Sequence, residues 1–194
     1  FMHFYRICLL HQRRLRLDFA IGQNIVHPAH GPGTIVAIEE DELVKGYHRF
    51  YVIEFTHNRL IVRLPVERVS EIGVREVMSQ ARYERVLSTL RALPEQMQSD
   101  FKSRRYRVNE LLHSGRPRQI AAAVRDLTWR KFEKHLTKAD ADQLSKGRQM
   151  LAAEVAMSNN EDVHEADQTI RAAVAESVAA QQALLQEVTE ADAV

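Results

Sequence analysis

The sequence predicts an α+β protein of two domains, a small β-barrel followed by an all-helical domain. Its 194 residues are enough for two small domains. Apolar residues alternate with a period of two from Phe19 onward, whereas after Gly73 they recur every three to four residues. This change of period places the domain boundary within residues 72–75. We therefore expect domains of residues 19–74 and 75–194 that fold independently.

Four segments of the first domain are predicted strands because they alternate or run in β-branched and aromatic residues. They are residues 23–26, 34–39, 50–55 and 60–64. Turn-forming residues separate them at 28–33, 45–46 and 57–58. Strands so short and closely spaced predict a strongly bent sheet. Such a sheet avoids open edges by curling into a barrel, as SH3-like and Tudor-like domains do.

Five helices are predicted in the second domain from the apolar spacing. They cover about residues 77–90, 101–112, 120–136, 138–155 and 162–188. Thr137 stands three residues before Asp140, which resembles a capping box and marks the start of the fourth helix. Trp129, three residues before Phe132, lies on a packing stripe, so we expect it in the core.

Charge is distributed unevenly along the chain although the formal net charge is only +1. Residues 19–79 hold six basic and eight acidic residues, residues 80–157 hold 16 and nine, and residues 158–194 hold one and eight. Only the middle segment has the excess expected of a phosphate binder. The sequence therefore indicates local nucleic-acid binding, with an acidic last segment that shields or pairs with the basic one.

The most basic stretch is residues 101–107, which hold four cations and two aromatic rings without an acid. Asp100 is available as a helix cap, so the stretch reads as the first turns of a helix. Helix starts favour anions, and arginines beside aromatic rings suit phosphates and groove edges. The alternative is a solvated basic face, in which Phe101 continues the apolar stripe through Val108 and Leu112.

Two further features of the barrel bear on a partner surface. Arg63 lies between Val62 and Leu64 in an apolar strand, so its side chain must point outward. An exposed arginine on a barrel strand is typical of a partner anchor, although a plain solvent-facing position is the commoner case. The acidic run at residues 39–42 is expected to be a solvated loop at the edge of a hairpin.

The histidines give little sign of a catalytic or metal site. His27 and His30 do not complete a zinc site, and the glycine spacing around them is not that of a Walker loop. We expect Gly31 and Gly33 to supply positive φ at a tight turn. Because serine, histidine and acidic residues never gather in a catalytic order, we predict no enzyme, no metal and no cofactor. An enzyme using His27 or His30 is the remotest alternative.

Cys8 is the only cysteine, which rules out a disulfide within the chain and a thiolate zinc site. A reducing, cytoplasmic location is expected. The apolar run at residues 7–10 is far too short to span a bilayer, so no membrane contact is predicted. Residues 1–18 precede the regular patterning and are expected to be a disordered extension.

With these residues in view, the chain resembles the CarD family of bacterial transcription regulators from Phe19 to the final helix. The first block of motifs is Phe19-Ala-Ile-Gly22, His27-Pro28, His30-Gly31, Gly33, Arg63-Leu-Pro65 and Ile72-Gly-Val-Arg75. The second is Ser103-Arg-Arg-Tyr106, Gly115, Val124-Arg-Asp-Leu127, Leu136-Thr137 and Arg148-Gln-Met-Leu151. The shared order is a β module followed by a basic helical module.

The resemblance implies a Tudor-like domain, shared with transcription-repair coupling factor, that binds the RNA polymerase β subunit. It also implies a helical domain that contacts double-stranded promoter DNA at the upstream edge of the bubble. Such proteins stabilise the open complex without chemistry. We expect this chain to be a monomer. The rival interpretation is a protein-interaction module, whose barrel reads a peptide and whose basic helix binds no DNA.

The resemblance also assigns residues to these contacts. Arg63 matches one arginine that contacts the β subunit, while the acidic residues 39–42 occupy the place of the other. Phe101 or Lys102 stands where the family has a tryptophan that wedges into the minor groove. The expected DNA-binding residues are Phe101, Lys102, Arg104, Arg105 and Arg107.

Overall fold

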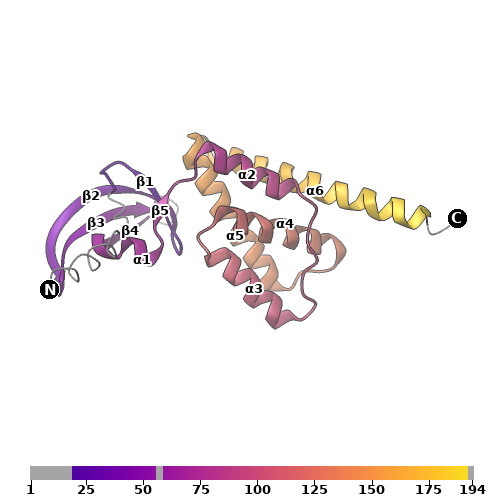
Figure 1. The fold of residues 1–194 in the computed structure, drawn as a ribbon, viewed down its shortest axis with the longest axis horizontal. Helices are drawn as coiled ribbons and strands as arrows, with labels where there is room; N and C mark the ends of the chain where they lie inside the picture. Colours follow the sequence, from indigo (N-terminus) through magenta and orange to yellow (C-terminus); the bar gives the residue numbers. More distant parts are fainter. Residues whose placement is uncertain (1–18, 56–58, 192–194) are drawn as a thin grey trace, which may run out of the picture.

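The computed structural model describes residues 19–55 and 59–191, which form a β part followed by a helical part (Figure 1). This order confirms the predicted α+β architecture. The expected disordered extension, residues 1–18, lies outside the described residues.

The β part is a five-stranded antiparallel sheet. Its strands are β1 (Asn24–His27), β2 (Gly31–Val44), β3 (Tyr47–Phe55), β4 (Leu60–Pro65) and β5 (Arg75–Glu76), in the order β4-β3-β2-β1-β5. The short helices η1 (Val66–Arg68) and α1 (Val69–Ile72) connect β4 to β5. Figure 1 shows β2 and β3 strongly curved. Within the described residues the edge strands β4 and β5 do not pair with each other, so curvature encloses the core.

The long strand β2 corrects the prediction for the acidic run. Residues 39–42 belong to β2 and are not a loop, and Glu39 and Glu40 lie opposite Phe50 and Arg49 of β3. The reason is that β3 begins at Tyr47, so its backbone continues to pair with β2 beyond the apolar segment. The pairing shifts in register between Glu40 and Val44, so the end of the acidic run forms an irregular part of the ladder.

The two glycines at the start of β2 have different roles. Gly31 has φ of +79°, as the predicted tight turn requires. Gly33 does not have positive φ, which corrects that part of the prediction. A Cβ atom there would lie 2.7 Å from Cδ1 of Phe55, so Gly33 allows the β2 backbone to approach a buried ring.

The helical part contains α2 (Gln80–Arg91), α3 (Phe101–His113), α4 (Pro117–Glu133), α5 (Lys138–Asn159) and α6 (Val163–Ala191). All five predicted helices are therefore confirmed. Asp100 Oδ2 accepts a hydrogen bond from Ser103 N at 2.8 Å and caps α3. Thr137 Oγ1 accepts from Asp140 N at 3.2 Å and caps α5.

Each part has its own apolar core. In the sheet the core includes Phe19, Ile25, Ile35, Tyr51, Ile53, Phe55, Leu64, Val69 and Val74. In the helices it includes Val86, Leu90, Val108, Leu112, Ile120, Val124, Leu127, Leu151, Val155 and Ile170. Trp129 is buried, as predicted, and stacks on Phe132 with ring centroids 5.4 Å apart. Phe132 itself is exposed.

The last strand connects the two parts. β5 pairs with β1 through Glu76, so the sheet continues past the predicted boundary at residues 74–75. Arg75 Nη2 donates to Glu154 Oε2 of α5 at 2.8 Å, and Arg75 Nε donates to the carbonyl oxygen of Gly115 at 2.6 Å. Met78 N also donates to Glu154 Oε1 at 3.0 Å. The buried carboxylate of Glu154 thus joins the sheet to the helices, and independent folding of the two parts stays a prediction.

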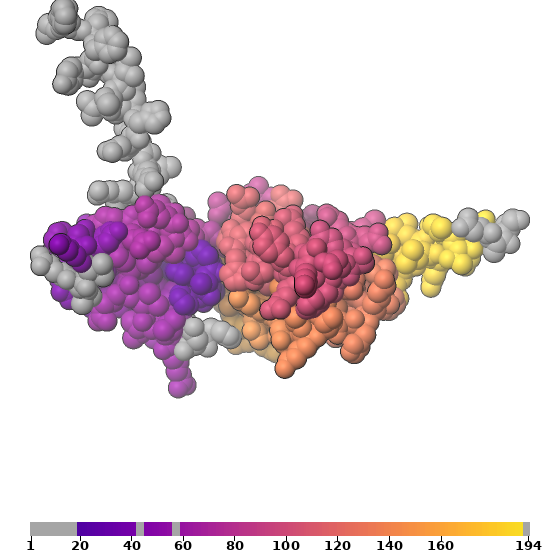
Figure 2. Space-filling model, turned by 90° about the horizontal axis from the view of Figure 1, so that it is seen from below, coloured from indigo at the N-terminus to yellow at the C-terminus, as the bar shows by residue number. Residues whose placement is uncertain are grey.

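Helix α6 is longer than the body on which it packs. Its last turns project beyond the other helices, as Figure 2 shows in yellow. The projecting segment exposes Leu184, Leu185 and Val188. Neither α6 nor any other helix of the described residues is apolar enough over a sufficient length to cross a membrane.

Candidate nucleic-acid and protein interfaces

Arg63 is on the surface of the sheet, as the sequence predicts. Its side chain is 53% exposed and lies on β4 opposite Val52 of β3. Arg63 Nε donates to Glu39 Oε2 of β2 at 2.8 Å, and this hydrogen bond together with the charge of Glu39 raises the pKa of Arg63. Glu39, the first residue of the acidic run, therefore lies beside the candidate anchor and shares its surface.

Helix α3 holds the predicted DNA-binding cations in three different environments. Lys102 and Arg105 are exposed. Arg107 is also exposed, but the helical rotation places it about 140–160° around the axis from these two residues. Arg107 contacts Glu110, with Nη1 3.6 Å from Oε2. The exposed cations of α3 therefore form two flanks of the helix instead of one basic face.

Arg104 is an interior residue, which corrects its assignment to the DNA contact. Its side chain is 2% exposed, and Nη2 donates to Asp140 Oδ2 of α5 at 3.0 Å. Nη1 donates to the carbonyl oxygen of Gln98 at 2.9 Å. The signal that could have identified it is the spacing of four that Arg104 shares with Val108 and Leu112, both buried on the same face.

Asp140 is held in its charged form by this pair. Burial acts to raise the pKa of Asp140, but the hydrogen bonds from Arg104 and Thr137 and the charge of Arg104 outweigh it. The pKa therefore lies below the usual range. Asp140 was predicted only as part of a capping box, and the structure gives its carboxylate a second role as the partner of a buried guanidinium.

Phe101 lies at the first position of α3, where its side chain is 40% exposed. The alternative in which Phe101 completes the core stripe is therefore not what the structure shows. Tyr106 on the same helix is 67% exposed. The start of α3 thus presents an aromatic ring beside the exposed cations Lys102 and Arg105.

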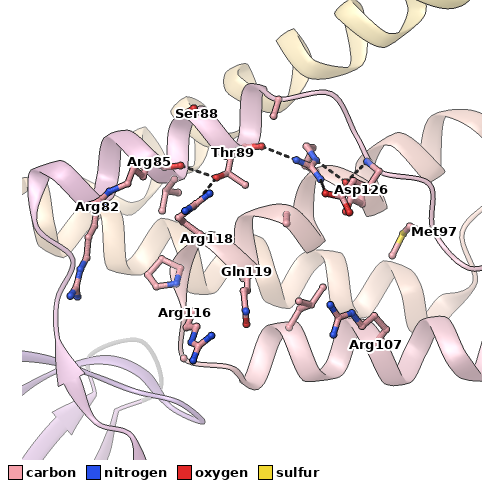
Figure 3. A pocket seen from close by; sticks show the side chains of 18 of the residues that line it. Arg82, Arg85, Ser88, Thr89, Met97, Arg107, Arg116, Arg118, Gln119 and Asp126 are labelled. Atoms are coloured by element: carbon pink, nitrogen blue, oxygen red, sulfur yellow. Dashed lines mark hydrogen bonds and ion pairs between the residues drawn. The ribbon is translucent and has the colours of Figure 1, made fainter.

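A groove of about 1130 Å³ lies between α2, α3 and the start of α4 (Figure 3). Its rim and walls hold exposed arginines from three elements, namely Arg82, Arg85, Arg107, Arg116 and Arg118. Of these only Arg107 was singled out from the sequence. The others are scattered over residues 82–118, and only the packing of α2 against α4 brings them together.

The far end of the groove contains a buried arginine. Arg125 Nε donates to Asp126 Oδ1 at 2.7 Å, and Arg125 Nη2 lies 3.6 Å from Glu95 Oε1 without a hydrogen-bond partner. Burial raises the pKa of Asp126, although the hydrogen bonds from Arg125 and from Glu95 N act in the opposite direction. Both carboxylates that line the groove are therefore already in contact with Arg125.

His27 and His30 lie close together without forming a metal centre. Their ring centroids are 4.6 Å apart, but no group of three metal-ligating side chains occurs in the part of the chain that the structure describes. His27 Nδ1 accepts hydrogen bonds from Ala29 N and His30 N at 3.1 and 3.3 Å. Burial, followed by the charge of His30, lowers the pKa of His27 to about 4. The ring therefore serves as a neutral acceptor that closes the turn.

Comparison with known proteins assigns both parts of the chain. Residues 19–78 match the CarD-like/TRCF RID domain, and residues 85–171 match the CarD C-terminal domain. The protein "Putative transcription factor YdeB" of Bacillus subtilis (strain 168) is 29% identical over 138 residues, which cover 71% of this chain and 90% of that protein. The two matches coincide with the sheet and with the core of the helical part. The chain therefore belongs to the CarD-like family of transcription factors, which act without catalysis, and its sheet is the family's RNA polymerase-interacting domain.

Proposed function

We propose that this protein binds the β subunit of RNA polymerase through its sheet and promoter DNA through the start of α3, and so stabilises the open complex. The observation that supports this most directly is the exposed cluster of Phe101, Lys102 and Arg105. It lies in the helical part and is separate from Arg63 on the sheet.

The polymerase contact is proposed for the surface around Arg63. A guanidinium presents several donors in a fixed plane, which suits a carboxylate or carbonyl group of a partner. Glu39 already orients this plane, with Oε2 2.8 Å from Arg63 Nε. A partner with both a basic and an acidic group would fit the paired charges, because complementary charge mainly sets specificity and the rate of association.

The DNA contact is proposed for Lys102 and Arg105, with Arg107 at the edge. Phosphate contacts of this kind position a protein without reading sequence, so little preference for particular bases is expected. Phe101 is exposed beside them and is the proposed wedge at the bubble edge, where an apolar ring separates base steps. The protein is proposed to act as a monomer.

The direct test is the lifetime of the open complex formed by RNA polymerase, measured with and without the protein. We expect the protein to lengthen it, and Lys102→Glu or Arg105→Glu to shorten it again. Lys131→Glu is the matched control, because Lys131 is an exposed cation on α4 that lines a different, apolar groove. An unchanged lifetime in the presence of the wild-type protein would refute the proposal.

Salt dependence tests the DNA contact by itself. With three exposed cations on α3, the slope of log affinity against log salt should lie at about −1 to −3. A flat response, together with retention of polymerase β in a pull-down, would favour the rival interpretation of a protein-interaction module without DNA binding.

A further inference from the structure

The groove between α2, α3 and α4 has an unusual excess of positive charge for a concave surface. Five exposed arginines line it, and the only lining carboxylates, Glu95 and Asp126, are in contact with Arg125. The guanidinium groups of Arg82 and Arg116 make no hydrogen bond or ion pair among the described residues, although the backbone of both residues is hydrogen-bonded. Like charges in a concave site focus a positive potential, which a bound anion would relieve.

The groups at one end of the groove are those that bind phosphate. Figure 3 shows Arg85, Thr89 and Arg118 together there, and Arg118 Nε donates to Thr89 Oγ1 at 3.5 Å. Helix α4 begins at the same place, and its N-cap residue Arg116 makes no side-chain capping bond. The Thr89 hydroxyl donates its proton to the carbonyl oxygen of Arg85 at 2.8 Å and serves to hold Arg118 in place. The guanidinium groups and the positive end of a helix dipole together favour an anion with several oxygens.

The remainder of the groove differs from this end. Met97 and Leu111 are half-buried there, and Arg125 lines the far end with its side chain 5% exposed. A DNA duplex presents its phosphates on a convex surface, so it can meet the exposed arginines of the rim but not the buried Arg125. A small ligand can enter the groove, and the volume of about 1130 Å³ is ample for one.

We propose that this groove binds a small anion with two or more linked phosphates. The ligand's phosphates contact Arg82, Arg85, Arg116 and Arg118, and Arg107 closes the rim on the side of α3. Two sources have this chemistry, a nucleoside polyphosphate and an inorganic polyphosphate chain. The site goes beyond the proposed function, because Lys102 and Arg105 lie on the other flank of α3 and do not line the groove.

The experiment is calorimetric titration of the full chain with ATP, with inorganic tripolyphosphate and with adenosine, at about 0.15 M salt, where long-range attraction is screened. Saturable binding with one site per chain is expected for both polyphosphates and none for adenosine. Tighter binding of ATP identifies a nucleoside polyphosphate, through contacts of the nucleoside with Met97 and Leu111. Tighter binding of tripolyphosphate identifies an inorganic chain.

Two variants locate the site. The double substitution Arg116→Gln and Arg118→Gln should weaken polyphosphate binding at least tenfold, whereas Arg105→Gln should leave it unchanged. If the double variant melts early, Arg82→Gln replaces it, because Arg82 is exposed and its side chain makes no hydrogen bond or ion pair among the described residues.

Three results would overturn the proposal. The first is the absence of saturable polyphosphate binding at millimolar concentration. The second is an equal loss of binding in Arg105→Gln. The third is displacement of bound ATP by duplex DNA, which would assign the groove to the DNA surface. Failure of the proposed function gives a different result. In that case Arg105→Gln leaves DNA affinity and open-complex lifetime unaltered, and this result does not depend on the polyphosphate titrations.

Discussion

Arg104 of α3 and Asp140 of α5 form an ion pair in the interior of the helical part, with side chains that are 2% and 0% exposed. Two hydrogen bonds join them, from Nη2 to Oδ2 at 3.0 Å and from Nε to Oδ1 at 3.2 Å. Such a pair contributes more to geometry than to net stability, because desolvation offsets most of the attraction. It fixes α3 against α5 and thereby sets the direction in which Lys102 and Arg105 point.

Removal of one partner of this pair should be costly. We expect Arg104→Met to lower the free energy of unfolding by about 3–5 kcal/mol, because it leaves the carboxylate of Asp140 buried and uncompensated. Urea denaturation measures the change. The double variant Arg104→Met, Asp140→Leu should recover much of the loss. A single variant within about 1 kcal/mol of wild type would contradict a buried pair.

The same pair predicts a pH dependence. The folded-state pKa of Asp140 lies below its unfolded value, so its contribution is fully present above about pH 3.9 and is lost as the pH falls through the folded pKa. Asp126, whose folded-state pKa is raised, has the opposite effect, because its protonation favours the folded state as the pH falls. The test therefore compares acid unfolding of wild type with that of Asp140→Asn. The variant should be less stable at neutral pH and should lose less further stability on acidification.

Charge reversal at Arg63 should weaken the polymerase contact without unfolding the sheet. Arg63→Glu places a second carboxylate beside Glu39 on an exposed surface, so we expect a small change in melting temperature and a clear loss of polymerase β in a pull-down. Arg68→Glu is the matched control, since Arg68 is similarly exposed and pairs with Glu71 three residues away. Equal retention of Arg63→Glu and wild type would remove Arg63 from the interface.

Phe101 and Trp129 should respond in opposite ways to truncation. Trp129 is 6% exposed, and Trp129→Ala should cost roughly 3–5 kcal/mol of stability, as for other large core aromatics. Phe101→Ala should melt almost normally yet shorten the open-complex lifetime, because the exposed ring is the proposed wedge. Thermal melts and lifetime assays on both variants decide. Early melting of Phe101→Ala, or normal melting with full activity, rejects the wedge.

His27 should destabilise the sheet on mild acidification. Its folded pKa of about 4 lies below the unfolded value of about 6.5, so the unfolded chain binds more protons between these values. Stability is then complete above about pH 6.5 and falls toward pH 4, by on the order of 1–3 kcal/mol. Protonation of Nδ1 would also break the bonds from Ala29 N and His30 N. The measurement is the free energy of unfolding of wild type and His27→Gln at pH 7 and at pH 4.5. An equal loss of stability in both proteins would exclude His27 as the cause.

The periodic elements were predictable because local patterns determine them. The spacing of apolar residues located all five helices of the second part, and the caps at Asp100 and Thr137 form as their sequence context indicates. Strand β5 has only two residues, too few to show a period, and its pairing with β1 depends on a distant segment. The boundary was therefore placed before Arg75 although the sheet includes it.

The candidate site was predictable only in part, because charge counts do not reveal burial. Four cations within residues 101–107 appeared equivalent, yet the helix rotates Arg104 into the core and Arg107 toward the groove. The arginines of α2 and α4 give no local signal, since more than twenty residues separate Arg85 from Arg116 and only tertiary packing makes them neighbours. Arg63 was identifiable because successive side chains of a strand point to opposite faces, so a cation between two apolar neighbours points to solvent.

Glu154 links the sheet to the helices through Arg75 and Met78, and this link has a consequence for the proposed complex. If polymerase holds the sheet, the contacts of Glu154 would keep the start of α3 at a fixed distance from the enzyme. Once the sheet is bound to polymerase, binding of α3 to the DNA is an intramolecular step. The effective concentration of α3 near the DNA is then high, so weak phosphate contacts are sufficient. The distance from the enzyme, and not the base sequence, would then determine where α3 contacts the DNA. Promoters of unrelated sequence would therefore be contacted at the same position.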